Sequence, residues 1–151
     1  MTELFALLEA SAPAAFLRGS FIAYPIVNAA HIFAIGALVT CAALMDLRIL
    51  GLGRAVPVKL VLDHLRPLAA VALLAAVVTG SLLFSVQPSD YASNLAFRVK
   101  LALVAAAIAN AVLYNLVADR LWSALRKGLA TLSLVLWLLV LVAGRFVGFF
   151  A

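Results

Sequence analysis

Four long apolar stretches decide what this chain can fold into. They cover residues 21–45, 67–86, 95–117 and 129–151. A helix needs about 20 mostly apolar residues to cross the hydrocarbon core of a bilayer, and lipid cannot pair with backbone polar groups, so we expect each stretch to be helical. The short connections favour antiparallel neighbours. The sequence therefore predicts an all-α integral membrane protein, a four-helix up-down bundle that forms a single domain over residues 1–151.

Composition excludes an ordinary soluble domain. Hydrophobic residues make up 68% of the chain and charged residues 11%. In soluble domains, apolar residues average about 45–50% and charged residues about 25%. Too few polar residues remain to cover a water-facing surface. The net charge of +5 comes from basic residues between the apolar stretches, which is typical of topology signals rather than of nucleic-acid binding. The predicted partner is the lipid bilayer, and no nucleic acid is expected.

The basic residues also predict the orientation. The connections after the first and third stretches carry seven of them: Arg48, Arg54, Lys59, Arg66, Arg120, Arg126 and Lys127. The opposite side carries four: Arg18, Arg98, Lys100 and Arg145. The positive-inside rule places the richer side in the cytoplasm and both termini on the outer side of the membrane.

Two short amphipathic segments are predicted to lie at the membrane surface. One covers residues 4–8 and ends before Pro13. The other covers residues 58–66, where apolar residues recur at helical spacing and charged residues occupy the opposite face. Within it, Lys59 and Asp63 are four residues apart, which favours an ion pair. Pro67 then marks a bend or boundary at the start of the second span.

Stripes of small residues predict where the helices touch. The second span carries Ala72, Ala76 and Gly80 at four-residue spacing, and the third carries Ala102, Ala106 and Asn110. Small residues at this spacing let helices approach closely in lipid. We expect both stripes to face neighbouring helices.

His31 is the most informative polar residue of the first span. It lies about eleven residues into that span, roughly 16 Å along a helix, and so on the outer side of the membrane centre. Asn28 and Tyr24 precede it by three and seven residues, so the three side chains share a helix face. An ionisable residue at this depth is typical of a ligand, proton or cofactor site. The alternative is a neutral histidine bonded to Asn28 or to a neighbouring helix for structural reasons alone.

The other spans place polar residues at the same outer level. They are Thr79 in the second span, Lys100 in the third and Arg145 in the fourth. If their faces converge on that of His31, the sequence predicts an outer-half pocket for transport or delivery. It would bind a metal ion, with His31 as the ligand, or a small solute. Otherwise Lys100 and Arg145 reach water with their long side chains, and Thr79 bonds to its own helix backbone.

Two further functions stay open. A bis-histidine haem b site needs both rings at one depth on facing helices, and His64 lies near the cytoplasmic edge, about 20 Å from His31. Haem b would therefore require a homo-oligomer or a partner membrane subunit. The alternatives are a haem- or quinone-linked electron-transfer subunit, or a structural accessory subunit with no ligand. Hydrolytic, zinc and phosphate-binding motifs are absent from the sequence, so no catalytic residue is predicted.

The cytoplasmic end of the first span combines opposite charges in Asp46-Leu-Arg48-Ile-Leu-Gly51. Arg48 complements the negative end of the helix dipole, and Gly51 suits a C-cap. The same dipole repels Asp46, so we expect a positively charged partner for it. The candidates are Arg48, Arg66 and Arg120. We interpret Asp46 and Arg48 as a structural latch that anchors the topology.

Several of these elements together resemble a known family. They are His31-x4-Gly36, Asp46-Leu-Arg-x-Leu-Gly51, Thr79-Gly80 and Phe97-x-x-Lys100. Spread over residues 24–110, they are similar to a family of small uncharacterised bacterial inner-membrane proteins, which implies that location but no activity. More distantly, a histidine-bearing span followed by spans with Thr-Gly and Lys resembles the membrane domain of copper-resistance and copper-export proteins, which implies copper as a ligand. This chain lacks the methionine-rich segments of such copper handlers.

Overall fold

The computed structural model describes residues 2–148, which fold into helices joined by short turns. In chain order the elements are α1 (Thr2–Glu9), α2 (Ala12–Gly19), α3 (Ala23–Leu50), α4 (Val58–Val86), α5 (Pro88–Ser93), α6 (Leu95–Val117), the 3₁₀ helix η1 (Ala118–Arg120) and α7 (Ser123–Val147). No strand occurs among these residues. Helices α3, α4, α6 and α7 are long and apolar enough to cross a membrane. The predicted all-α four-helix membrane bundle is confirmed.

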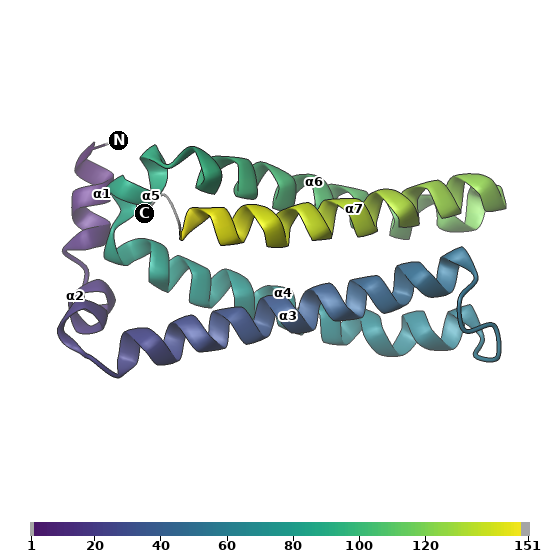
Figure 1. Ribbon diagram of the computed structural model, residues 1–151, viewed down its shortest axis with the longest axis horizontal. Coiled ribbons are helices and arrows are strands. Elements are labelled where there is room, and N and C mark those ends of the chain that lie inside the picture. The colour runs from purple at the N-terminus through teal and green to yellow at the C-terminus, as the bar shows by residue number, and fades with distance from the viewer. Residues whose placement is uncertain (1, 149–151) are drawn as a thin grey trace.

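The four long helices lie side by side in two pairs (Figure 1). Helix α3 packs against α4, and α6 packs against α7, while a contact between α3 and α7 joins the pairs. Helices α1, α2 and α5 lie together at one end of the bundle, which we call the capped end. The opposite end carries the loop 51–57 and η1, and we call it the loop end. In the predicted orientation the capped end is the outer one.

Helix α4 starts earlier than the predicted second span. It begins at Val58, directly after Pro57, and continues through Pro67. The amphipathic segment and the span are therefore one helix, because a proline removes only one backbone hydrogen bond and neighbouring helices can support the turn around it. The predicted ion pair in this segment is confirmed, with Lys59 Nζ 2.6 Å from Asp63 Oδ2.

Capping residues set the ends of two long helices. Helix α3 ends at Leu50 because Gly51 adopts a left-handed conformation, with a φ of 111°. Its backbone N–H donates to carbonyl groups of the last helical turn, as the predicted C-cap requires. At the capped end, Asn94 begins α6, and its Oδ1 atom accepts from two backbone N–H groups of the first turn.

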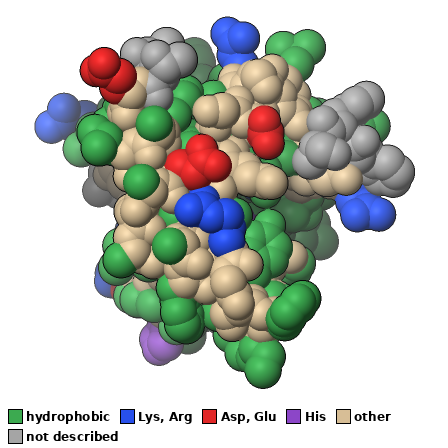
Figure 2. All heavy atoms as spheres, turned by 90° about the vertical axis from the view of Figure 1, so that its left-hand side faces the viewer, with side chains coloured by type: hydrophobic (Ala, Val, Ile, Leu, Met, Phe, Trp, Pro, Cys, Tyr) green, Lys and Arg blue, Asp and Glu red, His purple; other side chains and the backbone are tan. Residues whose placement is uncertain are grey.

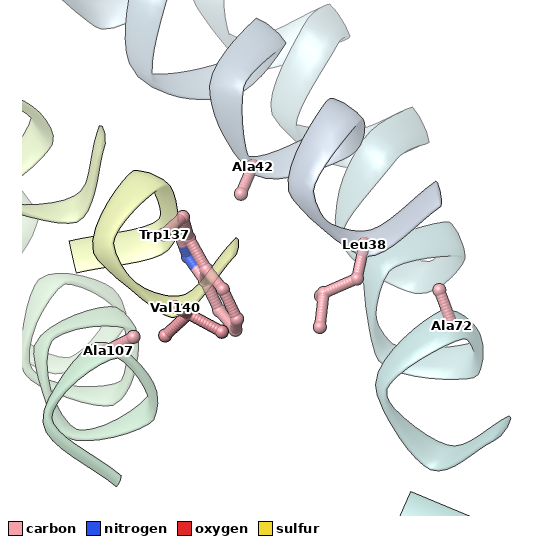
Figure 3. Packing of buried hydrophobic residues seen from close by; sticks show 6 residues of the cluster. All are labelled: Leu38, Ala42, Ala72, Ala107, Trp137 and Val140. Carbon is pink, nitrogen blue, oxygen red and sulfur yellow. The ribbon is translucent and has the colours of Figure 1, made fainter. Parts of the chain in front are cut away.

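An apolar core layer crosses the middle of the bundle (Figure 3). Its buried members come from all four long helices: Leu38 and Ala42 of α3, Ala72 of α4, Ala107 of α6, and Trp137 and Val140 of α7. Trp137 and Leu38 extend from α7 and α3 toward the centre of the bundle. In lipid, helices associate by close packing rather than by hydrophobic burial, so small alanines around one large ring suit this position. We call these six residues the core layer.

The contact face of α6 differs from the predicted stripe. Ala102 and Ala106 are exposed, whereas Ala107 and Asn110 are buried. Only Asn110 of the three stripe residues thus faces the bundle interior. Four-residue spacing fixes which residues share a face, but it does not fix which face meets the partner helix.

Aromatic rings and Arg18 hold the capped end together. Phe84 of α4 stacks on Phe97 of α6, with ring centroids 5.6 Å apart, and packs edge to face on Phe5 of α1. Arg18 of α2 donates from Nη1 to the carbonyl oxygen of Val86, 3.1 Å away at the end of α4. Arg18 therefore satisfies a carbonyl left open by the helix and offsets the helix dipole. At this end, charged side chains of both signs lie among hydrophobic ones (Figure 2).

Candidate functional site

His31 of α3 hydrogen bonds across to Thr79 of α4. The Nδ1 atom of His31 lies 2.9 Å from Thr79 Oγ1. The Thr79 hydroxyl has one proton, and it donates this proton to the Ala75 carbonyl oxygen, 2.6 Å away on the same helix. With the Thr79 proton on that carbonyl, Thr79 is the acceptor toward His31, and Nδ1 carries the ring proton. In the neutral ring, Nε2 is then unprotonated and offers a lone pair.

Gly80 lets the His31 ring lie against α4. A Cβ atom at this position would be 2.9 Å from His31 Cε1, closer than real Cβ contacts come. A side chain here would force the ring to move. Gly80 continues the line of Ala72 and Ala76, both of which are buried. The small residues of α4 thus allow a close approach between helices and also make room for the histidine.

Lys100 of α6 belongs to the same level. Its half-buried side chain runs along Gly144 of α7, where a Cβ atom would lie 3.7 Å from Lys100 Cε, an ordinary contact distance. The Lys100 ammonium also interacts electrostatically with His31. His31 and Thr79 are thus in direct contact, whereas Lys100 packs along α7 and reaches His31 only through a charge interaction. We call these three residues the outer site.

The remaining predicted pocket residues are placed differently. Asn28 is exposed on α3, and His31 bonds to Thr79 rather than to Asn28. Arg145 is exposed near the end of α7. Sharing a helix face with His31 does not bring Asn28 into the site, because the hydrogen-bonding partner of the histidine comes from the neighbouring helix.

Tyr24, also predicted for the pocket, contributes to the capped end instead. Burial, together with a side-chain hydrogen bond and a charge interaction with Tyr24, raises the pKa of Tyr91 from 10.0 to about 12. The Tyr91 ring also packs against Phe97, with centroids 5.4 Å apart. Tyr24 thus joins α3 to the aromatic cluster of α5 and α6.

A metal ion or haem needs more ligands than the outer site supplies. Among residues 2–148, no three or more His, Cys, Asp and Glu side chains gather where they could hold a metal ion. His64 is exposed on α4 and precedes Thr79 by about 22 Å along that helix. One chain therefore does not place both histidines on a single haem. A metal or haem at His31 would take its other ligands from a second chain.

Asp46 has a different partner from the one that its position predicts. In the described part of the chain, none of the three candidate arginines forms an ion pair with it. The Asp46 carboxyl interacts instead with Ser133 of α7, while Arg48 Nε donates to the Val56 carbonyl oxygen of the loop. Two residues apart on a helix, Asp46 and Arg48 point to nearly opposite sides, so they cannot form one latch. Arg48 ties the end of α3 to the loop without Asp46.

Comparisons with protein-family models, with curated proteins and with solved structures find no match for this chain. The chemistry of the outer site therefore carries the functional conclusion. That site offers one unprotonated imidazole nitrogen and one ammonium group, held inside a membrane bundle.

Proposed function

We propose that this polytopic membrane protein binds a small solute at the outer site. In this proposal it serves transport or delivery at a bacterial inner membrane, with both termini on the outer side. One observation supports the proposal: His31, which bonds to Thr79 through Nδ1, and the Lys100 ammonium interact by charge although they come from two different helix pairs. Ionisable side chains inside a membrane are costly and commonly mark ligand and ion pathways. Two of them brought together from separate helices favour a ligand over simple packing.

The two groups have complementary hydrogen-bonding roles. Lys100 donates up to three hydrogen bonds and carries a positive charge, whereas His31 Nε2 accepts one. A solute that pairs with both has an acceptor or negative charge close to an O–H or N–H donor. A small weak acid has this arrangement, and so does a hydroxylated ring such as a quinol. A metal cation suits the site less well, because the ammonium at the same level repels it.

Thermal unfolding of the detergent-purified protein tests the proposal. The probes are benzoic acid, a short-chain quinol and Zn²⁺, each titrated against the wild type and the variants His31→Ala and Lys100→Met. A ligand at about 100 times its Kd stabilises the folded state by about 2.7 kcal/mol. We expect the acid or the quinol to raise the Tm of the wild type and of neither variant.

His64→Ala is the matched control. His64 is exposed and bonds to the Leu60 carbonyl oxygen of its own helix, so this variant keeps the wild-type response to the probes. The proposal is contradicted if neither the acid nor the quinol stabilises the protein, or if only Zn²⁺ does so. It is equally contradicted if the stabilisation survives in His31→Ala.

A further inference from the structure

A second polar layer lies between the core layer and the loop end. It consists of Asp46 of α3, Asn110 of α6 and Ser133 of α7, and each of these residues is 7% exposed. Each is three or four positions from a core-layer residue of its own helix, and so lies on the same helix face, one turn closer to the loop end. Three buried polar side chains therefore follow the apolar layer on three of the four long helices.

Helix α7 connects the members of this layer. Ser133 interacts with the Asp46 carboxyl. Asn110 Nδ2 donates to the carbonyl oxygen of Leu129, 3.1 Å away. Leu129 precedes Ser133 by one helical turn, so Asp46 and Asn110 both approach the same short segment of α7. We call Asp46, Asn110 and Ser133 the inner site.

Two oxygen atoms of the inner site are unpaired. Asp46 Oδ2 and Asn110 Oδ1 are buried and have no hydrogen-bond partner within the described chain. An unpaired buried acceptor costs about 1–3 kcal/mol. Ser133 has a single hydroxyl proton and can donate to one oxygen at a time. The side chains of the inner site therefore present more acceptors than donors.

No described residue forms an ion pair that balances a charge on Asp46. On its own helix, Arg48 donates to the loop, and Cys41 is half-buried one turn earlier. The neighbouring elements carry the exposed residues Lys59, Asp63, His64, Arg66, Arg120, Arg126 and Lys127, and the half-buried Tyr114. An ionised carboxylate buried without a cation is far less favourable than the neutral carboxyl. The surroundings of Asp46 therefore favour its neutral form.

We propose that Asp46 is a proton-binding site, which keeps a proton on its carboxyl under conditions in which the exposed Asp63 is ionised. The bound proton removes the buried charge and converts one carboxyl oxygen into a donor. The same layer contains a second buried acceptor without a partner among the described residues, Asn110 Oδ1. This site is independent of the proposed solute site, because core-layer residues lie between His31 and Asp46 on α3 and between Lys100 and Asn110 on α6.

Carbon-13 NMR of aspartate-labelled protein in lipid bilayers tests the proposal. The labelled residues are Asp46, Asp63, Asp90 and Asp119. Their carboxyl carbons report protonation directly while the pH is varied. We expect one resonance to keep its proton where the others have ionised, and we expect that resonance to be missing from Asp46→Asn.

Asp63→Asn is the matched control. It removes an exposed aspartate that is paired with Lys59 and leaves the protonated resonance in place. The proposal is overturned if all aspartate resonances ionise together, or if the protonated resonance survives in Asp46→Asn. A resonance that responds to Na⁺ but not to pH overturns it as well, since the site would then bind a metal cation.

Chemical labelling of the wild type keeps the proposal testable if Asp46→Asn does not fold. A hydrophobic carbodiimide reacts with protonated carboxyl groups, and mass spectrometry locates the adduct. We expect an adduct on Asp46 and not on Asp63, with a yield that falls as the pH is raised. Adducts confined to the exposed aspartates, or a yield at Asp46 that is independent of pH, would overturn the proposal.

Discussion

The two polar layers of the bundle are built in contrasting ways. In the outer site, His31 donates to Thr79, and Gly80 leaves room for the ring. In the inner site, Asp46 and Asn110 each keep an oxygen that no described residue pairs with. The core layer lies between the two sites. The outer layer is thus fixed by protein contacts, whereas the inner layer has acceptors that protein contacts do not satisfy.

Because of this difference, the two sites suit different kinds of ligand. Protein groups hold the outer histidine in one orientation and leave one ring nitrogen open, which suits a reversibly bound solute. Among the described residues the inner carboxyl has no cationic partner, which suits a proton. The contrast matters inside a membrane, because bulk water is not available there to form hydrogen bonds with groups that the helices leave unpaired.

The largest effect is expected from removing the ring that separates the two sites. Trp137→Ala opens a cavity in the core layer, and substitutions of this kind cost about 3–5 kcal/mol. Reversible unfolding in detergent micelles measures the loss. Leu138→Ala is the control, because Leu138 is 58% exposed. Equal losses of stability in the two variants would contradict the role given to the core layer.

Gly80→Ala is expected to disrupt the outer site without affecting the inner one. The added Cβ atom would lie 2.9 Å from the His31 ring, and forcing extra atoms into a tight contact costs about 1–3 kcal/mol. The variant should lose stability and its response to the acid and quinol probes. Gly36→Ala is the control, since nothing lies within 4 Å of its Cβ position. A Gly80→Ala protein that responds to the probes like the wild type would rule out the proposed position of the His31 ring against Gly80.

Thr79→Val tests the hydrogen bond that orients the histidine. The change removes the acceptor of the His31 proton, and side-chain hydrogen bonds between membrane helices are worth about 0.6 kcal/mol on average. We expect a small loss of stability, a weaker response to the probes and unchanged aspartate resonances. Thr79→Ser keeps the hydroxyl and should restore the probe response. If Thr79→Val and Thr79→Ser behave alike, the hydrogen bond does not orient the ring.

The smallest effect is expected at the capped end, outside both sites. The pKa of Tyr91 is raised from 10.0 to about 12 in the folded protein, so the folded state holds this proton more tightly than the unfolded state does. The resulting stabilisation is complete below about pH 10 and is lost as the pH rises through about 12. The Tm of the wild type should therefore fall more over this range than that of Tyr91→Phe. Parallel curves for the two proteins would contradict the half-buried position of Tyr91.

Depth in the membrane can be predicted from the sequence, because each helical residue advances about 1.5 Å along the axis. Counting residues places His31, Thr79 and Lys100 at one level, and in the structure His31 hydrogen bonds to Thr79 and has a charge interaction with Lys100. The four apolar helices follow from hydropathy in the same way. Helix ends are predicted less well: α4 and α7 begin at Val58 and Ser123, before the predicted spans, and α4 continues through Pro67.

The direction in which each side chain points cannot be predicted in this way. It depends on how neighbouring helices meet, which the periodicity of one helix does not reveal. Asn28 shares a face with His31 yet is exposed, and α6 buries Ala107 rather than the predicted alanines. The sequence does not predict a site role for Ser133, because a serine in a membrane helix commonly bonds to its own backbone. The inner site therefore emerges only from the packed bundle.

Nitrogen-15 NMR of His31 in lipid bilayers tests the central claim most directly. In His64→Gln, His31 is the one histidine left in the chain. We predict a neutral ring that carries its proton on Nδ1, and an Nε2 resonance that moves when benzoic acid or the quinol is added. A proton on Nε2 in place of Nδ1, or an Nε2 resonance that neither probe moves, would contradict a solute site at His31.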